Sequence, residues 1–162
     1  MRACVTFPET VPIADNTNLQ WKGKPKDSEK TGGLGSKLDV WPLPEDTTGA
    51  PRLTSTHAVI LGKWVREQGA LTLMQAVANS TIVPAKRIEE HVSQFRTKGR
   101  LQDGMDADIT VFDPKTVKAN ATYTKPVILN DEFYHTIVNG QFVLKNGDIV
   151  MDALPGRAIL RT

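Results

Sequence analysis

Apolar residues recur at helical spacing between residues 54 and 95, in the middle of the chain. Ile60 and Trp64 lie four positions apart, so both side chains point to one face of a helix. Gly69 follows this pattern, and glycine commonly ends a helix. The sequence therefore predicts a first helix with one apolar stripe, which must pack against another part of the protein.

A second helix is predicted to open at Thr72, because Gln75 follows three positions later. In such a capping box the threonine hydroxyl takes one free backbone N–H and the glutamine amide reaches back to another. Pro84 has the backbone angle that suits the start of a third, short helix. The expected apolar face of the second helix consists of Leu73, Met74, Val77 and Ala78.

The pattern changes to strand signals after residue 96. Asn139-Gly140 separates two runs rich in apolar residues, and Asn146-Gly147 follows shortly afterwards. Because Asn-Gly accepts a positive φ at both central positions of a turn, it is the strongest short-range hairpin signal. The sequence predicts one separate strand followed by a three-stranded meander with two tight turns. The expected strands are residues 109–113, 134–138, 141–144 and 148–151.

The first third of the chain has weaker signals. Residues 1–15 are mostly apolar, and a short buried strand is expected over residues 11–14. Pro12 limits this strand to a sheet edge or a strand end, because proline cannot donate to a ladder. Residues 16–53 lack apolar periodicity and contain many glycines and prolines. A loop of this length is either a solvated connection or a cover over a substrate site.

The composition of the chain argues against several classes of function. The chain has 162 residues, which is enough for one domain but too few for a complete (β/α)₈ barrel of about 200 residues or more. A net charge of +2 gives no reason to expect nucleic acid or an anionic membrane as a partner. We also expect no membrane span and no secretory signal, which makes a cytoplasmic location the default. The single Cys4 excludes an intrachain disulfide.

Asp15 is the first candidate for chemistry, since it ends an apolar run where a strand would become a loop. The carboxyl ends of strands carry the active sites of α/β barrels. A carboxylate there can ligate a metal or take a proton from metal-bound water. Asp-Asn is also a common turn opener, so a purely structural role stays open.

The histidines are scattered, at positions 57, 91 and 135, and no His-x-His pair is present. A catalytic zinc needs about three converging protein ligands. His91 and His135 are therefore expected to be structural or surface residues. His57 follows Thr56 at a predicted helix start, where a neutral imidazole could face a pocket and bind substrate; a structural role is the alternative.

Residues 99–113 closely resemble a signature of the amidohydrolase superfamily, Gly-x-Leu-x-x-Gly-x-x-Ala-Asp. In that superfamily the segment returns the chain from a barrel to a small β-sandwich. Gly104 suits the turn, and Asp108 directly precedes a predicted strand. The ordered series around it looks like the end of the N-acyl-D-amino-acid deacylases. The segments that carry this wider resemblance are residues 65–67, 71–78, 81–85, 137–140 and 155–157.

The resemblance implies an α/β plus β fold. Residues 1–95 would supply the last strand, a long loop over residues 16–53 and the last helices, over residues 54–95, of a TIM-like amidohydrolase barrel. Residues 96–162 would supply part of a small β-sandwich domain with Asn-Gly hairpins.

The resemblance also implies hydrolysis of a linear amide C–N bond in an N-acyl-D-amino acid by a zinc enzyme. Family members hold metal with several histidines and with an Asp after the last strand, which also handles the proton of the attacking water. Only that last ligand has a candidate here, Asp15. The chain alone is therefore expected to lack activity and bound zinc. Where the family tends to have His-Pro-Arg, this sequence has His57-Ala58-Val59, which removes an expected anion-binding arginine.

A second hypothesis is a non-catalytic binding or oligomerisation module derived from the β-sandwich. In the absence of a barrel, the Ile60/Trp64 and Leu73/Val77 stripes would form an exposed apolar patch. Such a patch would lead to self-association through the helix faces.

Overall fold

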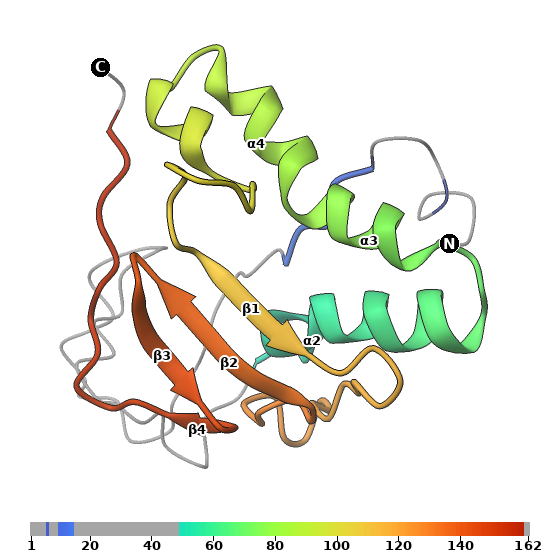
Figure 1. The fold of residues 1–162 in the computed structure, drawn as a ribbon. Coiled ribbons are helices and arrows are strands. Elements are labelled where there is room, and N and C mark those ends of the chain that lie inside the picture. Colours follow the sequence, from blue (N-terminus) through green and yellow to red (C-terminus); the bar gives the residue numbers. More distant parts are fainter. Residues whose placement is uncertain (1–5, 7–9, 15–48, 161–162) are drawn as a thin grey trace, which may run out of the picture.

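The computed structural model describes Thr6 and residues 10–14 and 49–160. Asp15 and most of the loop predicted for residues 16–53 lie outside the described residues. Figure 1 shows helices α3 and α4 running almost end to end along one side, with a small sheet beside them. Among the described residues, no helix is both long enough and apolar enough to cross a membrane.

The first predicted helix forms, but it begins earlier than expected. Helix α2 (Arg52–Val59) continues directly into the π-helix η2 (Ile60–Glu67), and Gly69 follows with a φ of 54°. The prediction that Gly69 ends the helix is confirmed. Pro51 already has helical angles, so the helix starts at Arg52. The prediction that His57 stands at a helix start is therefore wrong, because it lies in the last turn of α2.

Helix α3 (Leu73–Ser80) confirms the predicted capping box. The Gln75 backbone N–H donates to Thr72 Oγ1 at 3.2 Å, and the Thr72 backbone N–H donates to Gln75 Oε1 at 2.9 Å. The predicted apolar face is only partly correct. Met74 is 72% exposed, whereas Ala76 is fully buried, because the small side chain permits close packing at the centre of the helix cluster.

A third helix, α4 (Ile82–Glu89), carries Pro84 in its first turn as predicted. A 3₁₀ helix, η3 (Ser93–Thr97), then leads the chain towards the sheet.

The sheet is antiparallel, and its strands follow the order of the sequence. Its members are β1 (Ile109–Phe112), β2 (Phe133–Val138), β3 (Gln141–Lys145) and β4 (Asp148–Ile149). Both predicted turns form: φ is 47° at Asn139 and 54° at Asn146, and the glycine after each is also positive. The meander is therefore confirmed, although β4 is shorter than expected. The separate strand, β1, pairs with β2 and completes the sheet.

The strand predicted over residues 11–14 does not form. Residues 10–14 have no regular secondary structure, and Ile13 is 76% exposed. Pro12 has no N–H to donate, and none of the described strands pairs with this segment. The apolar run by itself was therefore not sufficient to make a strand.

A hydrophobic cluster joins the helices to the segment that follows β1. Its buried members are Ala58, Leu61, Ala76 and Val117, and Phe112 and Phe133 of the sheet pack against it. A Cβ at Gly62 would lie 2.8 Å from the Val117 carbonyl oxygen, so the absence of a side chain permits this approach.

The stripe expected to be exposed is not exposed throughout. Trp64 is only 8% exposed, and Leu73 and Val77 are half-buried. The helices pack on one another and on the Val117 segment. The Ile60/Trp64 stripe is therefore not the exposed patch expected from the sequence.

Candidate functional site

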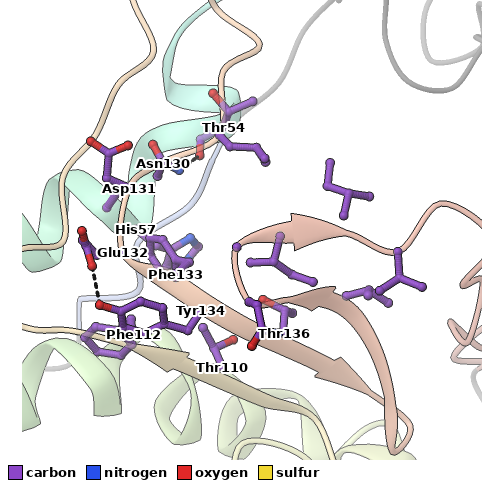
Figure 2. Close-up of a pocket in the computed structure, with 18 of the residues that line it drawn as sticks. Thr54, His57, Thr110, Phe112, Asn130, Asp131, Glu132, Phe133, Tyr134 and Thr136 are labelled. Atoms are coloured by element: carbon purple, nitrogen blue, oxygen red, sulfur yellow. Dashed lines mark hydrogen bonds between the residues drawn. The ribbon is translucent and has the colours of Figure 1, made fainter.

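A cavity of about 1150 Å³ lies between α2, the C-terminal end of α3 and the sheet. Its wall combines one face of α2 with side chains of all four strands and of the loop before β2. Figure 2 shows the residues around its α2 end. The residues used below are Thr54, His57, Asp108, Phe112, Asn130, Asp131, Glu132, Phe133 and Tyr134.

The charge of this lining is one-sided. Asp108, Asp131 and Glu132 line the cavity, and the described lining residues include no lysine or arginine. Phe112 and Phe133 add aromatic surface. Lys98 pairs with Asp108, but Asp131 and Glu132 would repel a carboxylate group here, whereas they would not repel a neutral or apolar group. The cavity is therefore suited to an uncharged part of a ligand.

His57 lines the cavity from α2, although the residue as a whole keeps an exposed surface. Burial of the ring lowers the pKa of His57 below its ordinary value. The imidazole is consequently neutral at pH 7 and can donate one hydrogen bond and accept one. His57 thus lies at the cavity wall, and its role in binding stays a prediction.

The first turn of α2 is tied to the loop before β2 by one amide. Ser55 Oγ donates to Asn130 Oδ1 at 2.8 Å, Asn130 Nδ2 donates to the Thr54 carbonyl, and the Asn120 backbone N–H reaches Asn130 Oδ1 at 3.4 Å. Ser55 is 3% exposed. We call Thr54, Ser55, Asn120 and Asn130 the Asn130 network.

The two carboxylates that follow Asn130 also accept hydrogen bonds from other side chains. The Asn120 side-chain amide donates to Asp131 Oδ1 at 2.6 Å. The Tyr134 hydroxyl donates to Glu132, which is the main reason that the pKa of Tyr134 is raised (Figure 2). Glu132 has a φ of 66°, an uncommon conformation for a residue other than glycine.

The segment with the superfamily signature forms a second polar cluster. Lys98 Nζ lies 2.8 Å from Asp106 Oδ2 and 2.6 Å from Asp108 Oδ2, while Asp108 Oδ1 accepts the Asn139 backbone N–H at 2.9 Å. Hydrogen bonds to Asp106 and Asp108 raise the pKa of Lys98. We call Lys98, Asp106, Asp108 and Asn139 the Lys98 network.

The surroundings of Asp108 have opposing effects on its pKa. Burial alone would raise its pKa, but the Asn139 N–H and the Lys98 ammonium outweigh burial and lower the pKa of Asp108. The signature residues thus fasten the helix-to-sheet connection to the β2–β3 turn, which is a structural role.

The described residues do not assemble a metal centre. Within residues 10–14 and 49–160, no three His, Cys, Asp or Glu side chains lie close enough together to hold an ion. The three histidines are therefore not brought together there, and Asp15 is outside these ranges. The donor set does not fit a zinc site by itself, and no catalytic step can be derived through it.

Sequence reasoning missed the Asn130 network. Asn130 meets Ser55 across 75 positions of the chain, so no local pattern could indicate the contact. The only signal was the polar run at residues 130–132 directly before an apolar strand.

A model of the amidohydrolase family matches residues 15–144, which is most of the chain. The protein belongs to the amidohydrolase family.

Curated relatives include two proteins of Alcaligenes xylosoxydans xylosoxydans. The N-acyl-D-glutamate deacylase is 40% identical over 98 residues, which cover 60% of this chain and 19% of the relative. The N-acyl-D-aspartate deacylase is 32% identical over 101 residues, which cover 62% of this chain and 19% of that protein. The chain thus spans about a fifth of the length of these relatives. The resemblance to the N-acyl-D-amino-acid deacylases is confirmed.

Solved structures lead to the same group. A D-aminoacylase with a binuclear metal centre matches 92% of this chain and 25% of its own, with a TM-score of 0.67 and 25% identity. The N-acyl-D-glutamate deacylase from Bordetella bronchiseptica, complexed with zinc and a phosphonate inhibitor, matches 67% of this chain and 23% of its own. Its TM-score is 0.56, at 35% identity.

Proposed function

We propose that this chain is the C-terminal part of a metal-dependent hydrolase that removes the acyl group from N-acyl-D-amino acids. The observation that carries the proposal is its 40% identity to an N-acyl-D-glutamate deacylase over 98 residues that cover only 19% of that relative. The reaction cleaves a linear amide C–N bond. In this proposal the chain supplies only part of the catalytic site, since it spans about a fifth of the length of that relative.

In this proposal, residues 1–95 belong to the end of the barrel and residues 96–162 to a β-sandwich. The change from helices to strands after Thr97 supports this division. The hydrophobic cluster around Val117 and Ala58 then forms the contact between the two parts.

Asp15 is the proposed metal ligand and proton acceptor. The family match begins at this residue. A carboxylate can fill either role beside zinc, which supplies a strong nucleophile by lowering the pKa of bound water. The remaining ligands come from the part of the enzyme outside this chain.

His57 is the proposed substrate-binding residue, and it contacts the neutral acyl end of the substrate. The carboxylates Asp131 and Glu132 on the same cavity repel the carboxylate end. A neutral imidazole can donate a hydrogen bond to the acyl carbonyl, and the cavity wall around it is partly apolar.

The test joins the N-terminal portion of a related deacylase to this chain and measures release of acetate from N-acetyl-D-glutamate. With Asp15→Ala we expect kcat to fall by about 10²-fold or more, as for loss of a proton-transfer group. Asp148→Asn, at an exposed carboxylate in β4, is the matched control and should retain the rate. An unchanged rate with Asp15→Ala removes Asp15 from the mechanism.

The alternative is a non-catalytic module that associates with itself or with a partner. Met74 is 72% exposed and Leu154 is 91% exposed, so apolar side chains do reach the surface. Light scattering of the chain decides this point, because a monomer that binds no apolar dye argues against the alternative.

A further inference from the structure

We propose that Asn130 is a positioning residue: its amide fixes the first turn of α2 and thereby the place where the His57 ring enters the cavity. This inference rests on the proposed function, in which His57 contacts the acyl group. Asn130 itself touches no reacting atom in this proposal.

The first observation is that α2 lacks a local cap. Pro51 occupies the N-cap position and makes no side-chain hydrogen bond there. Helices usually fix their first turn with a polar side chain at this position. The backbone N–H groups of the first turn bond locally to the Ala50 and Pro51 carbonyls, and side-chain contacts from elsewhere in the chain add to these bonds.

Asn130 supplies those contacts with both ends of its amide. Its oxygen accepts from Ser55 Oγ, and its nitrogen donates to the Thr54 carbonyl. The Thr54 hydroxyl adds a bond of 2.7 Å to the Pro126 carbonyl of the same loop. A side chain with a donor and an acceptor is required, so neither an aspartate nor an apolar residue can replace Asn130 in full.

The second observation is that the fixed turn and His57 share one face of the helix. Thr54 and His57 are three positions apart, which places both on the same side, and both line the cavity (Figure 2). Ser55 and Ala58 form the adjacent buried face, at 3% and 1% exposure. Movement of the first turn would therefore displace the His57 ring with it.

The third observation concerns the loop that carries Asn130. Asp131 and Glu132 follow Asn130 directly and also line the cavity. One amide thus joins the element that carries the imidazole to the segment that carries two carboxylates. The arrangement fixes the relative position of these groups around a ligand.

The experiment is an NMR titration of the histidine rings in the full chain, without substrate or metal. The chain has three histidines, and the His57 signal is identified by its loss in His57→Gln. In Asn130→Ala the ring should gain water, so we expect the pKa of His57 to rise towards that of an exposed histidine. Asp106→Asn is the control, because it removes an ion pair of the Lys98 network, does not line the cavity and should leave the pKa of His57 unchanged.

A purely structural role would lower the melting temperature of Asn130→Ala without moving the pKa of His57, and that result overturns the proposal. If Asn130→Ala does not fold, Ser55→Ala removes one of the bonds and decides the question. It should shift the pKa in the same direction by a smaller amount, and no shift would count against the proposal.

The proposed function fails separately, since its measure is the KM for N-acetyl-D-glutamate with His57→Gln in the joined enzyme. An unchanged KM removes His57 from substrate binding without changing what the titration says of Asn130.

Discussion

The Asn130 network and the Lys98 network both fasten a helical segment to the sheet side of the protein, but by different physical means. The Asn130 network is neutral, partly buried and built from residues about 75 positions apart. The Lys98 network is charged and partly exposed, and its ion pairs join residues 8–10 positions apart. Loss of a buried hydrogen bond lowers the free energy of unfolding substantially, whereas loss of an exposed ion pair lowers it only slightly because solvent screens the charges. We therefore expect the less conspicuous neutral network to contribute more to stability.

The largest expected effect is that of Asn130→Ala. The substitution leaves Ser55, which is 3% exposed, without its acceptor on Asn130 and removes two further hydrogen bonds. We expect the free energy of unfolding to fall by about 2–3 kcal/mol, the cost of leaving buried polar groups unpaired. Urea denaturation followed by circular dichroism measures this change. If Asn130→Ala lowers the free energy of unfolding by less than Asp108→Asn does, the Asn130 network is not the stronger of the two.

Asp108→Asn should have a smaller effect. The amide oxygen can still accept the Asn139 N–H, but the charge that attracts Lys98 is lost. Because the Asp108 side chain is 30% exposed, solvent screening limits the expected loss to about 0.5–1 kcal/mol. The same denaturation experiment in 1 M NaCl provides the control, since salt should reduce the difference between Asp108→Asn and the parent chain.

The smallest effect is a difference in pH dependence. The pKa of Asp108 is lowered in the folded protein, so its contribution is present above the unfolded value of about 3.9. That contribution is lost as the pH falls through the folded value. Between pH 6 and pH 3 the parent chain should therefore lose more stability than Asp108→Asn. The difference between Asn130→Ala and the parent should narrow over the same range, because only the parent keeps the burial that lowers the pKa of His57 and disfavours its protonation. Equal slopes for Asp108→Asn and the parent would contradict this prediction.

Most of the secondary structure could be predicted from short-range patterns. The Thr72–Gln75 capping box, Gly69 and the two Asn-Gly turns each fix the backbone through neighbours a few positions away. The same reasoning failed at residues 11–14, where a strand was predicted but does not form, since a strand requires a partner that the local sequence does not contain.

The candidate site was less accessible to sequence reasoning. The role of His57 stays a prediction, and its place within α2 was misjudged because Pro51 starts the helix earlier than the apolar pattern indicates. Asn130 was missed altogether, because an asparagine before a strand is typical of any loop. Asp15 lies outside the described residues, and its role stays a prediction.

The sequence by itself determined the family, the helix ends and the hairpin turns, because these depend on neighbouring residues and on a linear motif. Only the tertiary structure decided that Asn130 meets Ser55, that Ala76 rather than Met74 is buried, and that His57 faces a cavity with carboxylates and no described cation. Those features depend on contacts between distant segments, where packing and desolvation are settled only when the whole chain has folded.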